Sequence, residues 1–131
     1  MHGFKDDIEK LTLENNNFRK VLYTTKLSQL VLMALKPSEE IGEEVHQVDQ
    51  FFRFEQGIGV VLIDDTRYDV MDGDVIIVPA GAKHNVINAS ADQPLKLYTL
   101  YAPPHHKDGI VHTTKEDAEQ SDPDFDGTTT E

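Results

Sequence analysis

Short runs of β-branched and other apolar residues, each closed by Pro, Gly or Asp, are the feature that most restricts the fold of this chain. Four of them span residues 29–36, 57–63, 75–78 and 95–101. Such runs with turn residues at their ends are typical of β-strands. The intervals between them are too short for crossover helices, so we predict an all-β fold, an antiparallel sandwich or barrel.

Two short helical segments are predicted outside these strands. The first covers residues 5–13, and the second covers residues 113–119. In the second segment a Thr precedes several acidic residues, which is typical of a helix N-terminus. Neither segment carries residues that suggest chemistry of their own.

The negative charge of the chain is concentrated at its C-terminus. The 131 residues carry a formal charge of -12, and residues 116–131 hold seven acidic side chains and no Lys or Arg. This segment has almost nothing apolar to bury, so we predict an acidic disordered tail there. The remaining residues, 1–115, are expected to form one domain with a barrel core over about 28–102.

The composition excludes several classes of function. Nucleic acids and anionic membranes require a basic surface, which this acidic chain lacks. The absence of Cys removes thiolate metal sites and cysteine nucleophiles, which leaves His and carboxylates as the strong metal ligands. Residues 2–9 lack the apolar stretch of a signal peptide, and no apolar run approaches the length of a membrane span, so we expect a cytoplasmic protein. The expected partner is a small-molecule ligand.

The residues that can bind a metal ion gather in the stretch from 41 to 57. Glu44 and His46 are separated by one residue, so on a strand they project to the same side and can share one ion. A turn after His46 brings Gln50 back towards the same point. His84 begins another strand and offers a further donor from across the barrel.

These residues resemble two motifs of the cupin superfamily. Residues 44–57 resemble the first motif, and five residues match the second in identity and spacing: Gly73, Pro79, Gly81, His84 and Asn88. The resemblance implies a double-stranded β-helix, or jelly roll, and a metal site formed by Glu44, His46, Gln50 and His84. Here Glu44 stands where cupins commonly have His, and Gln50 where they have Glu, so the net ligand charge stays at -1.

The resemblance extends to short single-domain cupins that are often labelled mannose-6-phosphate isomerase-like. It is carried by residues 18–23, 29–33, 49–53 and 108–112. A sugar phosphate needs cationic side chains in the pocket, for which Arg53, Lys83, Lys96 and Lys107 are the candidates. Arg53 is the decisive one, because an outward-facing Arg53 would argue against a phosphate group.

Several functions are compatible with this ligand set. Two His and a carboxylate suit a divalent first-row metal ion, Fe, Mn, Ni or Zn. Such an ion can support isomerase-like or lyase-like Lewis-acid chemistry on an oxygen-rich sugar or carboxylate, or dioxygenase chemistry at Fe(II). The alternative that is not an enzyme is a non-catalytic cupin that binds a metal or a metabolite.

Two histidines near the end of the predicted barrel are candidate acid–base catalysts, because His titrates near neutral pH. They are His106 and His112, and an ordinary loop position explains them equally well. On the last strand, Lys96, Tyr98 and Tyr101 are candidates for lining the pocket. The apolar run from Leu30 to Leu35, with Phe18, Leu22 and Tyr23 upstream, is expected to contribute partly to the core and partly to a homodimer surface.

Overall fold

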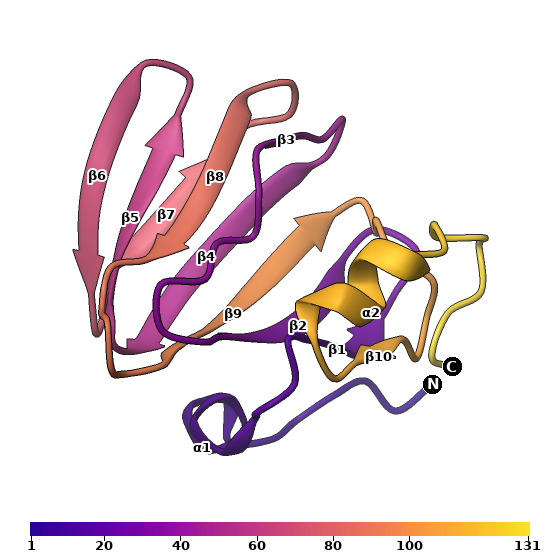
Figure 1. The fold of residues 1–131 in the computed structure, drawn as a ribbon. Coiled ribbons are helices and arrows are strands. Elements are labelled where there is room, and N and C mark those ends of the chain that lie inside the picture. The colour runs from indigo at the N-terminus through magenta and orange to yellow at the C-terminus, as the bar shows by residue number, and fades with distance from the viewer.

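Two antiparallel sheets packed face to face form the protein, as the computed structural model of residues 1–131 shows (Figure 1). The six-stranded sheet has the order β10 (Val111–His112), β1 (Arg19–Thr24), β2 (Gln29–Leu35), β9 (Leu95–Ala102), β4 (Asp49–Gln56) and β7 (Val75–Val78). The four-stranded sheet has the order β3 (Glu44–Val45), β8 (Lys83–Asn88), β5 (Ile58–Ile63) and β6 (Thr66–Met71). The predicted antiparallel double-stranded β-helix is confirmed.

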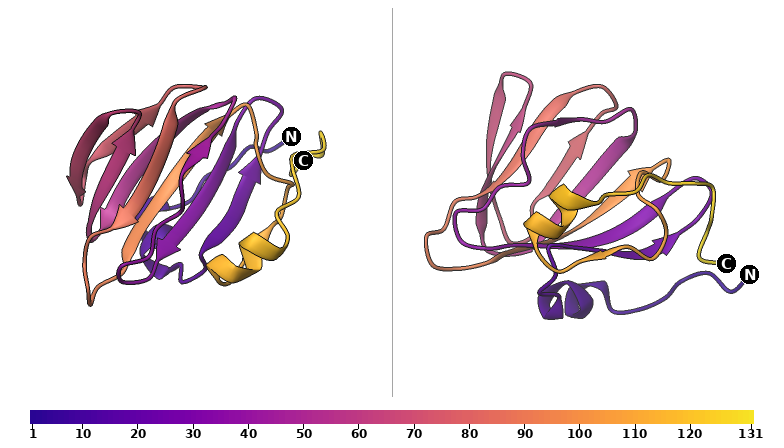
Figure 2. Two further views of the ribbon diagram at one scale, coloured as in Figure 1. Left: turned by 45° about the horizontal axis from the view of Figure 1, so that its top comes forward. Right: turned by 45° about the vertical axis from the view of Figure 1, so that its right-hand side comes forward.

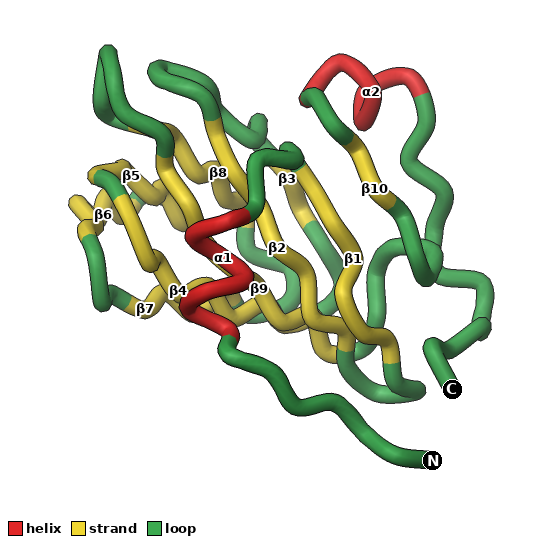
Figure 3. The backbone as a smooth tube through the Cα atoms, turned by 90° about the horizontal axis from the view of Figure 1, so that it is seen from below, coloured by secondary structure: helices red, strands yellow, loops and turns green.

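Two short helices lie outside the sheets, near the predicted positions. Helix α1 (Ile8–Glu14) packs on the outer face of the six-stranded sheet, across β2, β9 and β4 (Figure 3). Helix α2 (Lys115–Gln120) follows β10 and lies beside the open end of the barrel (Figure 2). Neither helix is long and apolar enough to cross a membrane.

The core fills the space between the sheets and follows the alternation of side chains along each strand. It contains 17 buried apolar residues in one cluster. On β2, Val31, Met33 and Leu35 point into this cluster, so they cannot form the predicted dimer surface. Leu30 and Ala34, on the opposite face of the same strand, are partly exposed.

Only one of the β9 residues that were predicted to line the pocket faces the interior of the barrel. Thr99 and Tyr101 point into the barrel, whereas Lys96 and Tyr98 lie on the outer side of the sheet. Lys96 is buried there, and its ammonium donates to the Leu13 carbonyl oxygen and to Asn16 Oδ1, which holds the last turn of α1 and the residues after it against the sheet. Of the three predicted pocket residues on this strand, only Tyr101 faces the interior.

The C-terminal segment is placed against the barrel, in contrast to the predicted disordered tail. Helix α2 begins with a capping box between Thr114 and Asp117. Further along, the backbone of Asp124 bridges to that of His106, and Thr130 N–H donates to the Thr24 carbonyl oxygen at 3.0 Å. Polar contacts to the barrel therefore position the C-terminal segment. The low apolar content of this segment, on which the prediction was based, does not reveal such contacts.

Candidate metal centre

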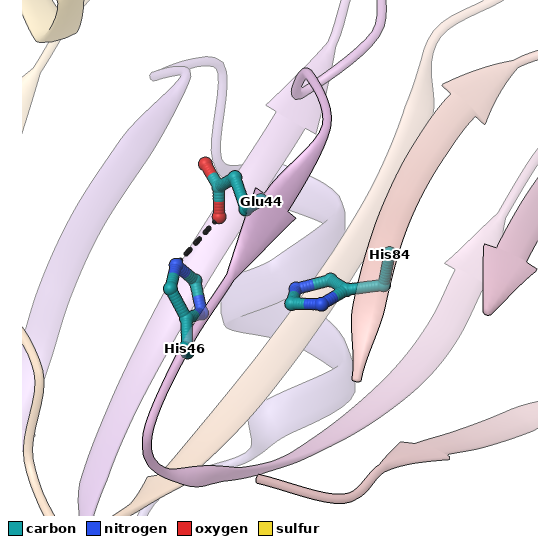
Figure 4. Close-up of side chains that lie close together, drawn as sticks. All are labelled: Glu44, His46 and His84. Atoms are coloured by element: carbon teal, nitrogen blue, oxygen red, sulfur yellow. Dashed lines mark ion pairs between the residues drawn. The ribbon is translucent and has the colours of Figure 1, made fainter. Parts of the chain in front are cut away.

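Three potential ligands converge at the open end of the barrel (Figure 4). Glu44 lies on β3 directly opposite His84 on β8, and His46 follows β3 by one residue. One ligand atom from each of the three residues lies within 4.8 Å of the others. The alternation of β3 turns Val45 to the outside, with 53% of its surface exposed, and leaves Glu44 and His46 on the same side. The turn before β8 helps to position His46, because Gly81, at φ 90°, donates its N–H to the His46 carbonyl oxygen at 2.8 Å.

His46 is held on both ring nitrogens. Its Nδ1 lies 3.3 Å from Gln50 Oε1, and the Gln50 amide in turn donates to Thr99 Oγ1 at 3.1 Å. Because an amide oxygen can only accept, Nδ1 carries the proton, and Nε2 points towards Glu44 Oε2 at 2.7 Å. The structure thus brings the predicted residue Gln50 to the site, where its oxygen orients the imidazole of His46.

His84, like His46, directs its Nε2 atom towards the group of three potential ligands. Its Nδ1–H donates to the Ala82 carbonyl oxygen at 3.0 Å, which leaves Nε2 with a free lone pair. This Nε2 is buried and has no hydrogen-bond partner in the protein. A buried polar atom without a partner is costly, whereas a histidine with Nδ1–H fixed by a carbonyl is the usual state of a metal ligand. The donor set therefore fits a divalent metal ion.

The electrostatics of Glu44 and His46 support the same interpretation. Burial favours the neutral forms of both groups, but their hydrogen bond and mutual attraction outweigh it. The pKa of Glu44 is lowered and the pKa of His46 is raised. Below the raised pKa, a proton lies between His46 Nε2 and Glu44 Oε2. A cation bound at this position would replace that proton.

A second group of polar residues adjoins the site. Tyr101 lies with its ring centroid 6.0 Å from that of His46, and its hydroxyl is 3.2 Å from His106 Nε2. His106 Nδ1 lies 2.9 Å from Asp122 Oδ1. Burial, only partly offset by the contact with Asp122, lowers the pKa of His106, so this ring is neutral at pH 7 and accepts a hydrogen bond from Tyr101.

His105 also reaches the site. Its ring centroid lies 4.2 Å from that of His46, and burial, with the neighbouring His106 and His46, lowers the pKa of His105 to about 4. The backbone N–H groups of both His105 and His106 donate to Gln29 Oε1, a buried amide on β2. These two hydrogen bonds to Gln29 fix the backbone of the loop that carries His105 and His106. Sequence reasoning missed Gln29, since nothing distinguished it from any other strand residue.

The remaining predicted residues lie away from the ligand group. His112 uses both ring nitrogens elsewhere, with Nδ1 3.3 Å from Arg19 Nη1 and Nε2 donating to the Ser121 carbonyl oxygen at 2.7 Å. Arg53 is separated from Gln50 by three positions on β4, so it points outwards, where it pairs with Glu55 at 3.1 Å. The outward orientation of Arg53 argues against a phosphate group on the substrate.

Arg19 and Asp122 belong to the surroundings of the site, although the sequence did not point to either. Arg19 is 4% exposed and lies 3.4 Å from Asp122. Both residues line a cavity of about 100 Å³ together with Glu44. Three larger hollows, of about 250, 350 and 330 Å³, contain none of the three ligand residues.

Comparison with known proteins identifies the family. The cupin domain family matches residues 31–101, which include Glu44, His46 and His84. The chain belongs to the cupin family. A crystal structure of BH2720 from Bacillus halodurans superposes on this cupin with a TM-score of 0.88 and 41% sequence identity, over 92% of this chain and 98% of that one. The structure of TT1209 from Thermus thermophilus is similar over 76% of this chain and 96% of that one, with 26% identity and a TM-score of 0.66.

Two curated relatives are similar in sequence over most of this cupin. Uncharacterized protein YrkC of Bacillus subtilis is 48% identical over 122 residues, which cover 88% of this chain and 65% of YrkC. Uncharacterized protein L612 of Acanthamoeba polyphaga mimivirus is 41% identical over 109 residues, which cover 80% of this chain and 68% of L612. The chain thus spans about two-thirds of the length of these relatives.

Proposed function

We propose that this cupin holds a divalent first-row metal ion through Glu44 Oε2, His46 Nε2 and His84 Nε2, and that it acts on a small oxygen-rich metabolite. The observation that carries the proposal is the state of the two imidazoles. Each has its Nδ1–H engaged by an acceptor within the protein, so both direct Nε2 to one point, where His46 Nε2 lies 2.7 Å from Glu44 Oε2 and His84 Nε2 has no partner. The partnerless Nε2 of His84 is otherwise difficult to explain.

The donor set limits the metal and the chemistry. Imidazole and carboxylate ligands without sulfur suit Fe, Mn, Ni and Zn. When bound, such an ion supplies Lewis-acid activation of a ligand oxygen, as an isomerase-like or lyase-like reaction requires. We assign Gln50 to orienting His46, because its oxygen accepts from His46 Nδ1–H and its amide is engaged by Thr99.

Tyr101, His106 and Asp122 are suited to moving a proton at this site. Burial raises the pKa of Tyr101, so its hydroxyl is protonated at neutral pH and donates to His106 Nε2. Tyr101 can pass its hydroxyl proton to His106 Nε2 as its oxygen accepts a proton from a ligand, and Asp122 stabilises the imidazolium form of His106 that results. Of the two predicted acid–base histidines, we therefore retain His106. We assign His112 to holding the C-terminal segment, because both of its nitrogens are engaged there.

Dioxygen activation is the second candidate, since two His and one carboxylate form the ligand set of non-haem Fe(II) oxygenases. Oxygen consumption by the protein assembled anaerobically with Fe(II) separates the two reactions. Uptake with a diol or carboxylate substrate would favour the oxygenase, and its absence with all substrates would favour the Lewis-acid reaction. A protein that binds the metal without turning over any substrate would be a binding cupin.

Metal loading provides the direct test of the site. We expect about one equivalent of metal per chain by elemental analysis of protein purified without a chelator. At a free metal concentration about 100 times the dissociation constant, binding stabilises the folded state by about 2.7 kcal/mol. The midpoint of thermal unfolding should then rise by about 10 °C and return to its original value when a chelator is added.

The pH dependence of metal binding serves as the control for this test. Because the pKa of His46 is raised by Glu44, the ion must displace a proton at lower pH. The apparent affinity should therefore increase as the pH rises through the pKa of His46, and calorimetry in buffers of different ionisation enthalpy should detect the released proton. Substoichiometric metal under every loading condition would exclude the site.

A homodimer is a further proposal, based on the outer face of the six-stranded sheet. Ile77, Phe51, Leu100 and Leu30 lie in register across four neighbouring strands, and Ile77 is 63% exposed. We expect Ile77→Glu to convert the dimer to a monomer in size-exclusion chromatography at several concentrations. Leu62→Glu, on the outer face of the other sheet, should leave the dimer intact. A wild-type monomer at high concentration would refute this interface.

A further inference from the structure

Arg19 is a buried cation whose hydrogen-bonding capacity is only partly used. It lies on the inner face of β1, between His112 on β10 and Met33 on β2. Its Nη1 atom lies 3.3 Å from His112 Nδ1 and 3.4 Å from Asp122 Oδ2. The Nε atom is buried and has no partner in the protein. One edge of the guanidinium is therefore anchored, while Nε–H retains an unused donor.

An unused donor on a buried charged group has an energetic consequence. Leaving a buried donor unsatisfied costs about 1–3 kcal/mol, and more for a charged group. An acceptor oxygen that enters from outside the protein recovers this free energy. Charged acceptors recover the most, since hydrogen bonds between guanidinium and carboxylate groups are about twice as strong as neutral ones.

Arg19 and the metal ligand Glu44 line the same small cavity. Its volume is about 100 Å³, and α2 contributes Ala118 and Glu119 to its wall. Since a water molecule occupies about 30 Å³ in the liquid, this space suits a ligand of only a few non-hydrogen atoms. His46 and His84 do not line this cavity, so a ligand seated there meets the ligand group at Glu44.

The charge of the cavity lining depends on the metal. The acids Glu44, Glu119 and Asp122 and the bases Arg19 and Lys115 line it, which gives a net charge of -1. A bound divalent ion changes this to a net charge of +1. An anion is therefore repelled by the empty site and attracted by the loaded one.

We propose that Arg19 Nε–H binds the carboxylate of a small hydroxycarboxylate whose hydroxyl end reaches the metal centre. This inference rests on the proposed metal site and names the substrate class that the site would take. It assigns to Arg19 the role that the sequence suggested for Arg53. It also explains why the guanidinium is anchored through Nη1 alone.

Arginine side-chain NMR of the Zn²⁺-loaded protein tests the inference, because Zn²⁺ is the diamagnetic member of the expected metals. The chain contains three arginines, Arg19, Arg53 and Arg67, so the ¹H–¹⁵N spectrum of the Nε–H groups holds three signals. Arg19→Lys identifies the signal of Arg19. On titration with glycolate we expect a saturable shift of this signal, with Arg53 and Arg67 unchanged, and no shift without Zn²⁺.

Two further measurements complete the test. Ethylene glycol replaces the carboxylate of glycolate by a neutral hydroxymethyl group and should leave the Arg19 signal in place. Arg19→Lys should weaken glycolate binding at least tenfold by calorimetry while Zn²⁺ affinity stays within a factor of three. The wild-type titration remains decisive even if the variant folds poorly.

Each contrary result has a distinct meaning. Zn²⁺ binding without a glycolate shift at Arg19 overturns the inference and leaves the metal site standing. An equal shift with ethylene glycol, or a shift with inorganic phosphate but not with glycolate, overturns the carboxylate assignment. Failure of Zn²⁺ to bind overturns the metal site and this inference together.

Discussion

His84→Ala is expected to weaken metal binding at least 100-fold, equivalent to about 2.7 kcal/mol. Loss of a residue that merely orients a ligand typically costs 10-fold to 100-fold, and His84 is proposed to bind the ion directly. The metal-free protein should lose less stability, because there the substitution removes the hydrogen bond from Nδ1–H to the Ala82 carbonyl oxygen, worth about 0.5–1.5 kcal/mol, and no contact of Nε2. Competition with a chelator of known affinity measures the first effect, and urea unfolding of the metal-free protein measures the second.

His105→Ala is the matched control for this prediction. Its ring centroid lies 4.2 Å from that of His46, yet none of its atoms belongs to the ligand group, so metal affinity should change less than tenfold. Equal losses in the two variants would mean that the ligands are wrongly assigned. Retention of full affinity in His84→Ala would exclude His84 from the site altogether.

The gathering of Glu44, His46 and His84 was predictable from local geometry within each strand together with the resemblance to the two cupin motifs. Glu44 and His46 share a side through the alternation of β3, and the turn that contains Gly81 precedes His84 at a fixed spacing. The strands were predictable for a similar reason, since each β-rich run ends in residues that cannot continue pairing. The role of Gln50 was harder to predict, because an amide oxygen can accept from an imidazole as readily as it binds an ion.

Other parts of the site depend on contacts that local sequence does not encode. Alternation on β9 indicated that Lys96 and Tyr98 share a face, but only the packing of the two sheets decides that Thr99 and Tyr101 occupy the inner one. The C-terminal segment was predicted to be disordered from its composition. Its position depends on a pair of charges, Arg19 and Asp122, that are 103 residues apart in the chain.

Asp122→Ala is expected to destabilise the protein by about 2–3 kcal/mol. Removing one member of a buried ion pair costs about 3–5 kcal/mol because the other charge is left uncompensated. Arg19 is 4% exposed, but Asp122 is 34% exposed, so solvent screening reduces the cost. The same substitution removes the carboxylate beside His106 Nδ1. Urea unfolding at pH 7 measures the loss, on protein free of metal.

The stability difference is measured at pH 7 because the pKa of Asp122 is lowered in the folded protein. Burial opposes ionisation of Asp122, but the hydrogen bond with His106 and the nearby positive charges outweigh it, and the pKa is lowered. A carboxyl group with a lowered pKa stabilises the folded state above its unfolded pKa of about 3.9 and loses this effect as the pH falls. The stabilisation is therefore fully present at pH 7, and the difference between variant and wild type should shrink below about pH 4.

Asp124→Ala isolates the contribution of the ion pair from the general effect of charge. It removes the same charge two residues away, and the exposed Asp124 side chain makes no hydrogen bond, so stability should change by less than about 0.5 kcal/mol. The double variant Arg19→Met with Asp122→Ala should recover part of the loss, because the uncompensated charge is removed as well. If Asp122→Ala behaved like Asp124→Ala, the C-terminal segment would not be docked on Arg19. The acidic residues after α2 would then form the disordered tail that the composition predicts.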